Sequence, residues 1–335
     1  MSASEVHLMR KLVGSGWCAA ALLGALASTN CSDDPPSKNS GEESDASASA
    51  DVPRPEDGQT SLPDGSAEND ASAEVGSDAA VADPCGTAAF CEKFDGYASV
   101  TNIVDAQKFG PWRAVLKAGS TMKLDGTHKV SGGNALHMHI DTKVTAGGRL
   151  FAEGAQPIFA SKPTHVYGRL MMYIDPNGPS EHWTFFGVNG TADPASPAAG
   201  RNASFLLSSL PRKNVNTFSF VYGLSPVKNG DGGHDCSTQS VTPMPSAKWT
   251  CVAFDLDSVA RKLRMYEDAV TAPIVSVDEH GTGCVKPTAV DSPWYGPVVN
   301  QLYVGAYSFH DMVSPLDVWI DDVVMDTKPV SCPAP

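Results

Sequence analysis

The stretch VYGRLMMYI, residues 166–174, predicts a β-strand that is buried on one face. Successive side chains of a strand point to opposite sides of the sheet, so every second residue shares a face. One face of this stretch holds Gly168, Leu170, Met172 and Ile174, and the other holds Tyr167, Arg169, Met171 and Tyr173. The strand therefore has an apolar face for a core and an amphipathic face that carries rings and charge.

The same alternation recurs in short runs between residues 85 and 335, and each run ends near Gly, Pro, Asn or Asp. Long amphipathic helical patterns are absent from this part of the sequence. Further runs are ALHMHID, HWTFFGVNG, ASFLLSSL, NTFSFVYGL, KWTCVAFDLD, KLRMYED and NQLYVGAYS. Many short strands at regular spacing are typical of two packed antiparallel sheets. We therefore predict an all-β fold, a two-sheet antiparallel β-sandwich of the jelly-roll type, over residues 85–335.

Residues 1–30 have the features of a signal peptide. Arg10 and Lys11 precede an apolar run that is too short, and too rich in Gly and Ser, to cross a membrane as a helix. Acylation of Cys31 would give a lipid-anchored lipoprotein, although residues 28–30 depart from a good lipobox. Cleavage before residue 28 without acylation would give a secreted protein. Acylation leaves an even number of cysteines for disulfides, so the sequence favours a cell-envelope lipoprotein.

Residues 31–84 are predicted to be a disordered acidic linker, because their composition cannot bury a core. Residues 32–83 contain 14 acidic side chains, two basic ones and no aromatic one, which gives this segment a formal charge of −12. We interpret it as a solvated spacer, with cation binding as the alternative. The folded domain has no basic patch, so nucleic acid is not expected as a partner, and we expect a monomer.

The order of several runs resembles the polysaccharide-lyase-like jelly rolls related to glucuronan lyase and to a secreted, cellulose-induced fungal protein. The matching runs are CEKFDG, KVSGGNALHM, THVYGRLMMYI, EHWTFFGV, KWTCVAFDLD with KLRMYED, LYVGAYS and VWIDDV. The resemblance covers nearly all of residues 90–333. The resemblance implies a concanavalin-A-like sandwich that binds or cleaves polysaccharide, and the wider class of lectins and glucanases is the alternative.

The pair Asp321-Asp322 interrupts the apolar run PLDVWIDDVVMD, residues 315–326. A buried carboxylate requires a partner or a metal, and neighbours in a strand face opposite sides, so we expect Asp321 to be packed and Asp322 to be solvated or paired with a surface base. The resemblance implies a structural calcium ion, which takes oxygen ligands. Its predicted ligands are Asp95, Ser131, Asn134 and Asp321. The alternative is that Asp321 accepts backbone amides without a metal.

Six cysteines of the predicted domain allow about fifteen pairings. The resemblance implies a bridge between Cys251 and Cys332. It leaves Cys85 with Cys91 as a local loop and Cys236 with Cys284 between long loops. A zinc site is not expected, since neither CxxC nor HxxxH spacing occurs.

Jelly rolls of this class bind polysaccharide across a concave sheet, and the alternation of each strand indicates which side chains line it. Aromatic rings stack on the apolar faces of sugars, while Arg, Gln and Asp bond their hydroxyls. Ordinary β-propensity also produces such faces. The predicted substrate-binding residues are Tyr167, Arg169, Tyr173, Arg264, Tyr266, Asp268, Gln301 and Tyr303.

β-Elimination from a uronic acid needs a group that neutralises the carboxylate and a base near the C5 proton. The resemblance implies His182 and Tyr307 as the candidate catalytic residues. The Arg and Gln cluster of the family's middle strand is not matched, because residues 201–206 read RNASFL, and no E-x-D-x-E glucanase pattern occurs. The sequence therefore favours an exported, lipid-anchored polysaccharide-binding protein. A polysaccharide lyase with an altered active site is the alternative.

Overall fold

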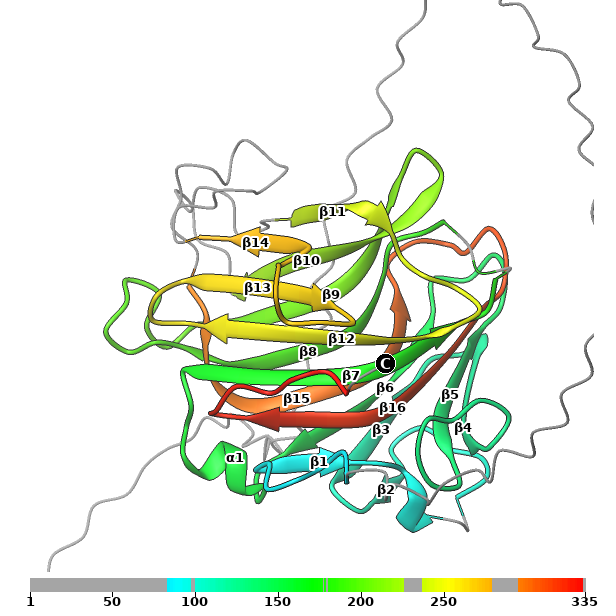
Figure 1. Cartoon of the computed structure of the whole chain (residues 1–335), viewed down its shortest axis with the longest axis horizontal. Helices are drawn as coiled ribbons and strands as arrows, with labels where there is room; N and C mark the ends of the chain where they lie inside the picture. Colours follow the sequence, from blue (N-terminus) through cyan, green and yellow to red (C-terminus); the bar gives the residue numbers. More distant parts are fainter. Residues whose placement is uncertain are drawn as a thin grey trace, which may run out of the picture. The chain divides into compact units, whose positions relative to one another are not determined.

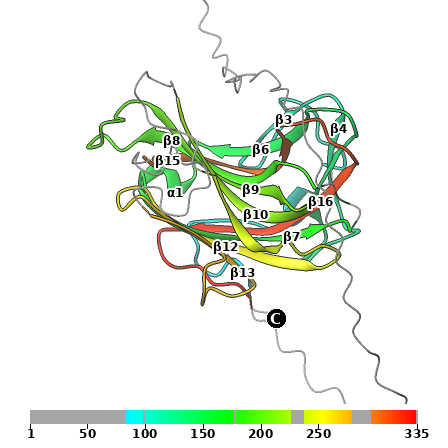
Figure 2. The same ribbon diagram turned by 90° about the horizontal axis from the view of Figure 1, so that it is seen from above.

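A computed structural model describes residues 83–97, 100–176, 178, 180–225, 237–278 and 295–333. The predicted all-β fold is confirmed, because these residues form two antiparallel eight-stranded sheets (Figure 1). Figure 2 views the two layers from another side. The short helix α1 (Pro157–Ala160) and the 3-10 turn η1 (Asp95–Tyr97) lie outside the sheets.

We name each sheet after a central strand. The β7 sheet contains, in spatial order, β14 (Val275–Val277), β13 (Lys262–Glu267), β12 (Trp249–Asp257), β7 (His165–Ile174), β16 (Leu316–Asp326), β5 (Ala135–Ile140) and β4 (Ser120–Asp125), with β1 (Phe90–Glu92) paired to β16. The β15 sheet contains β11 (Ser237–Pro243), β10 (Val215–Ser225), β9 (Asn202–Arg212), β8 (Trp183–Ala192), β15 (Pro297–Ser308), β6 (Gly147–Glu153), β3 (Trp112–Leu116) and β2 (Lys108–Phe109).

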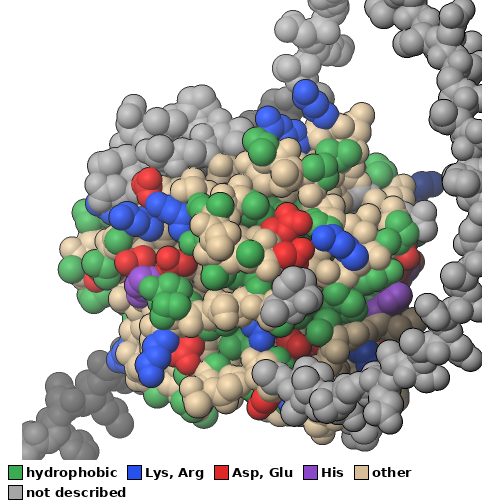
Figure 3. Space-filling view, in the orientation of Figure 1, with side chains coloured by type: hydrophobic (Ala, Val, Ile, Leu, Met, Phe, Trp, Pro, Cys, Tyr) green, Lys and Arg blue, Asp and Glu red, His purple; other side chains and the backbone are tan. Residues whose placement is uncertain are grey.

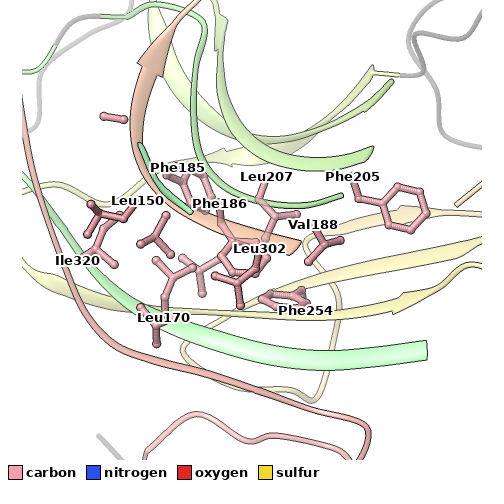
Figure 4. Packing of buried hydrophobic residues seen from close by; sticks show 14 of the residues in the cluster. Leu150, Leu170, Phe185, Phe186, Val188, Phe205, Leu207, Phe254, Leu302 and Ile320 are labelled. Carbon is pink, nitrogen blue, oxygen red and sulfur yellow. The ribbon is translucent and has the colours of Figure 1, made fainter. Parts of the chain in front are cut away.

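The hydrophobic core lies between the two sheets. Leu170 and Met172 of β7 are buried in it, which confirms the predicted apolar face of that strand. From the other sheet, Phe186 of β8 packs on Phe254 of β12 with ring centroids 4.6 Å apart. Figure 4 shows these rings among aliphatic side chains of both layers. Burying a side chain of this size contributes roughly 1.5–3 kcal/mol to folding, so the layers are held mainly by the apolar faces of their strands.

Strands β9 and β10 form a tight hairpin next to the edge strand β11 of the β15 sheet. Arg212 pairs with Val215, which leaves Lys213 and Asn214 as a two-residue loop. Both loop residues have positive φ, 51° and 62°. This is the backbone of a type I′ turn, whose twist matches that of the flanking strands. The turn therefore fixes the register of the two long strands.

The Asp321-Asp322 pair lies at a β-bulge in β16. Asp321 lies opposite Met171 of β7, whereas Val324 lies opposite Arg169, so β16 contains one extra residue here. Asp322 has a φ of 47°, and both aspartates are buried. The prediction that Asp322 faces solvent was wrong, because the bulge interrupts the alternation on which it depended.

Two of the predicted disulfides are present. Cys85 is bonded to Cys91, and Cys251 of β12 is bonded to Cys332 in the segment that follows β16. Bonds of this kind persist in oxidising compartments, which agrees with an extracellular protein.

Several predictions concern residues outside the described part of the chain. These are the signal peptide, Cys31, the linker up to residue 82, and the pairing of Cys236 with Cys284. In the ranges that the structure describes, no helix is long and apolar enough to cross a membrane.

Candidate functional site

The sandwich divides the predicted substrate-binding residues between its two outer faces. The β7 sheet carries or borders Tyr167, Arg169, Tyr173, Arg264, Tyr266 and Asp268, whereas the β15 sheet carries Gln301, Tyr303 and the candidate catalytic Tyr307. The core separates the two groups, so one binding surface cannot contain both. The prediction of one shared surface was wrong, because alternation identifies the residues that share a strand face but not the sheet to which the strand belongs.

Three polar members of the β7-sheet group hold neighbouring segments of the fold together. Arg169 is buried, and its Nη2 donates to the Pro84 carbonyl at 2.8 Å. Asp268 accepts a backbone amide of β12 at 2.9 Å, and Arg264 donates to Asp278 at 2.8 Å. These contacts explain Arg264 and Asp268 without a ligand, whereas Arg169 also has a buried Nη1 atom without a hydrogen-bond partner.

The outer face of the β15 sheet gathers one arginine and three aromatic rings. Arg149 of β6 lies opposite Gly305 of β15 in the antiparallel pair, so the Arg149 side chain lies between Tyr303 and Tyr307. The guanidinium carbon lies 4.3 Å from the ring centre of Tyr307, 5.3 Å from that of Tyr303 and 5.4 Å from that of Phe151. Attraction between the cation and the ring faces holds the guanidinium above the sheet. We call these four side chains the Arg149 cluster.

Glycines make the space that this cluster occupies. A Cβ atom added to Gly187 of β8 would lie 2.3 Å from the Tyr303 ring. Gly305 has a φ of 146°, and a Cβ atom there would lie 2.2 Å from the carbonyl oxygen of Gly148. Larger residues at either position would displace the strands or the Tyr303 ring, so both glycines are required for the observed packing.

Three polar atoms in and beside the Arg149 cluster are buried without a hydrogen-bond partner of good geometry. They are Arg149 Nε, Tyr303 Oη and Thr184 Oγ1. Burial raises the pKa of the Tyr303 hydroxyl, and the neighbouring Arg149 and Thr184 side chains only partly offset that rise. Unpaired buried polar atoms are rare in folded proteins, because each costs about 1–3 kcal/mol.

A row of polar side chains crosses the sheet beside the cluster. Asn189 of β8 donates to Gln301 of β15 at 2.8 Å, and Gln301 donates to Glu153 of β6. Glu153 also accepts from Arg113 of β3 at 3.3 Å. The row continues the outer face over four neighbouring strands and offers amide and carboxylate groups to sugar hydroxyls.

His182 lies just before β8, at the end of the same face. Its ring packs on Phe309 with a centroid distance of 4.7 Å, and Phe309 packs edge-on against Tyr307 at 5.4 Å. The two candidate catalytic residues are therefore both neighbours of the Phe309 ring, and Arg149 lies over the ring of Tyr307.

Arg149 and Phe151 were not predicted from the sequence as residues of the site. The run GGRLFAE, residues 147–153, alternates Arg149, Phe151 and Glu153 on one face, which is the signal that identifies it as a strand of the site. The resemblance placed the family's Arg and Gln cluster on the strand of residues 201–206, where it is not matched. Arg201 is buried, and it precedes β9.

The predicted calcium ligands surround the loop between β4 and β5. Asp321 Oδ2 accepts the amides of Val130 at 2.9 Å and Ser131 at 3.3 Å, and the Ser131 hydroxyl donates to Asp322. Asp95 Oδ1 accepts the amide of Asn134 at 3.3 Å. Backbone N–H groups, rather than carbonyl oxygens, thus face the carboxylates, and the described residues hold no group of three acids, histidines or cysteines arranged for a metal.

Burial raises the pKa of Asp321 to about 7, and the charge of Asp322 adds to that rise. Since the folded pKa exceeds the unfolded value of 3.8, the stabilisation from protonated Asp321 is complete below about pH 4 and is lost as the pH rises through about 7. In calcium-free buffer we expect the free energy of unfolding to fall by up to about 4 kcal/mol between pH 4 and pH 8 from this group. Urea denaturation across this range should show a flatter profile for Asp321→Asn. An equally steep profile in that variant would assign the pH dependence to other groups.

No protein-family model matches the chain, and no curated protein matches it. Solved structures similar to it include the cellulose-induced protein Cip1, at 17% identity and a TM-score of 0.45 over 71% of this chain and 98% of that one. The endo-β-1,4-glucuronan lyase of the fungus Trichoderma reesei has 13% identity and a TM-score of 0.47 over 73% and 98% of the two chains. The alginate lyase vAL-1 from Chlorella virus has 11% identity and a TM-score of 0.41 over 65% and 93%. The similarity concerns the fold alone.

Proposed function

We propose that the domain binds an acidic polysaccharide across the outer face of the β15 sheet. Arg149 carries this proposal. Its guanidinium is held by three rings, its Nε is buried without a partner, and it forms no ion pair within the described residues. A planar guanidinium matches a carboxylate in two parallel hydrogen bonds, so Arg149 would bind a uronate group.

The neighbouring side chains suit the rest of a sugar chain. Tyr307 is partly exposed, and its ring offers an apolar face for stacking. Tyr303 forms a buried floor beneath the Arg149 guanidinium. The Asn189, Gln301 and Glu153 row would then contact hydroxyls further along the chain.

Binding to a panel of soluble polysaccharides tests this function. We expect retardation in gels that contain uronic-acid polymers such as alginate, polyglucuronate or polygalacturonate, and micromolar to millimolar dissociation constants by calorimetry. Absence of binding to every acidic polymer in the panel would contradict the proposal.

A lyase acting on such a polysaccharide is the second candidate, and the adjacency of Arg149 and Tyr307 favours it. β-Elimination requires neutralisation of the carboxylate and a base at the C5 proton, and these two side chains lie 4.3 Å apart from guanidinium carbon to ring centre. His182, one ring further along, would be the alternative base. Cleavage creates an unsaturated uronate that absorbs ultraviolet light. We expect Tyr307→Phe to abolish that absorbance while binding persists. If the wild type binds the polysaccharide but produces no absorbance, the protein binds the polymer without cleaving it.

We further infer that the chain is exported and anchored through an acylated Cys31, with residues 32–84 as a spacer, and acts as a monomer. The signal-like residues 1–30 and the two disulfides support export. Mass spectrometry of the mature N-terminus tests the anchor. We expect a diacylglyceryl group on Cys31, and an unmodified N-terminus at residue 28 would contradict it.

We propose that calcium binds beside the loop between β4 and β5, with Asp95, Ser131, Asn134 and Asp321 as ligands. The charges of Asp95, Asp321 and Asp322 and the raised pKa of Asp321 support this site. The backbone amides of the loop now face the carboxylates of Asp95 and Asp321, so the loop must rearrange before calcium can bind. At pH 8 we expect millimolar calcium to raise the melting temperature of the wild type but not of Asp321→Asn. Insensitivity of the wild type to calcium and to a chelator would exclude the site.

A further inference from the structure

A second group of aromatic side chains crosses the outer face of the β7 sheet. Trp249 of β12 lies opposite Tyr173 of β7, Tyr173 lies opposite Trp319 of β16, and Trp319 lies opposite His137 of β5. The four rings thus form one row across four neighbouring strands. With strands about 4.8 Å apart, the row is roughly 15 Å long.

The rings of this row support one another. Ring centroids are 5.8 Å apart between Trp249 and Tyr173, 5.7 Å between Tyr173 and Trp319, and 4.0 Å between Trp319 and His137. His128, from the loop between β4 and β5, stacks on Tyr173 at 4.1 Å. Trp319 is buried beneath the others, while Trp249, Tyr173 and His128 remain partly exposed. We call these five side chains the aromatic row.

Packing of the core does not explain the aromatic row. Tyr173 is on the face of β7 opposite Leu170 and Met172, which point into the core. Rings on the solvent side of a sheet that are gathered in one row, rather than scattered, are typical of surfaces that bind a partner. Figure 3, which views this outer face, shows hydrophobic side chains interspersed with charged ones.

Polar groups border the aromatic row and are already oriented. Asp317 lies 2.7 Å from Nε2 of His137 and 3.0 Å from Nδ1 of His139. Asp125 lies 3.0 Å from Nδ1 of His137 and accepts from the Trp319 indole at 3.3 Å. Carboxylates and imidazoles held in this way can bond the hydroxyls of a ligand without losing further side-chain entropy.

The charge of this border selects the class of ligand. Asp125, Asp141 and Asp317 lie beside the aromatic row. Lys123 pairs with Asp125 at 2.9 Å, and His137 and His139 lie against the three carboxylates. An acidic glycan would meet carboxylates here, whereas a neutral sugar chain offers apolar ring faces and hydroxyls to the same groups.

We propose that the aromatic row is a second carbohydrate-binding surface, which takes a neutral polysaccharide on the side of the sandwich opposite Arg149. A sugar chain lies across the strands, stacks on Trp249, Tyr173 and His128, and bonds the carboxylates of Asp125 and Asp317. This surface does not depend on the site proposed for acidic polysaccharide, because the core separates the two sheets.

Affinity electrophoresis of the full chain in gels containing hydroxyethyl cellulose, a neutral polymer, tests the proposal. We expect the wild type to be retarded and Trp249→Ala to be retarded at least tenfold less. His128→Ala should also weaken retardation. Because His128 lies in a loop, this variant provides the test if Trp249→Ala does not fold. His165→Ala is the matched control, since His165 is a partly exposed histidine at the other end of β7 that bonds Asp255.

Two further outcomes separate this surface from the first site. Arg149→Ala should keep full retardation by the neutral polymer while losing that by alginate. No retardation of the wild type by the neutral polymer, or equal effects of His128→Ala and His165→Ala, would overturn the proposal.

Discussion

Replacing Arg149 with alanine should weaken binding of an acidic polysaccharide by roughly 30- to 150-fold, which corresponds to about 2–3 kcal/mol. The variant loses the guanidinium that would pair with a uronate carboxylate, while the aromatic rings around it remain. Calorimetry with alginate oligosaccharides measures the effect. Arg149→Lys should give an intermediate loss, because it keeps the charge but lacks the planar fork.

Arg264→Ala is the control for this prediction. Arg264 has the same charge and was predicted from the sequence to bind substrate, but it lies on β13 of the other sheet and bonds Asp278. Its replacement should leave the affinity for acidic polysaccharide unchanged. Equal losses for Arg149→Ala and Arg264→Ala would indicate a diffuse charge effect and contradict a site at Arg149.

Removing the Cys251–Cys332 disulfide should lower the free energy of unfolding by about 4–5 kcal/mol. The bond closes a sequence separation of 81 residues and ties the segment after β16 to β12, so its loss frees a long loop in the unfolded chain. Urea denaturation of the double variant Cys251→Ala/Cys332→Ala measures the change.

The Cys85→Ala/Cys91→Ala double variant is the comparison, because that bond closes a separation of only 6 residues. It should cost about 2 kcal/mol in the same chain-entropy picture. Equal destabilisation by the two double variants would show that loop length does not govern their contributions.

The strands could be predicted from the sequence because side-chain alternation is a local property. The apolar face of VYGRLMMYI is buried as predicted. The bulge at Asp322 could not be predicted, since an extra residue in β16 is visible only against the register of β7. One such residue turned a predicted surface carboxylate into a buried one.

The site was predicted less well, because it depends on which strands become neighbours. Tyr303 and Tyr307 were identified from their strand, but Arg149 reaches them only because β6 pairs with β15. The residues of β7 and β13 were assigned to the same surface on chemical grounds, yet they belong to the other sheet. Long-range pairing, which no local pattern encodes, decided both outcomes.

The central claim is that Arg149 recognises a uronate carboxylate. Calorimetry with a uronic-acid oligosaccharide and its carboxyl-reduced neutral counterpart, each titrated into the wild type and Arg149→Gln, tests it most directly. We expect the wild type to prefer the acidic ligand by at least tenfold and Arg149→Gln to bind the two ligands alike. An unchanged preference in Arg149→Gln would contradict the claim.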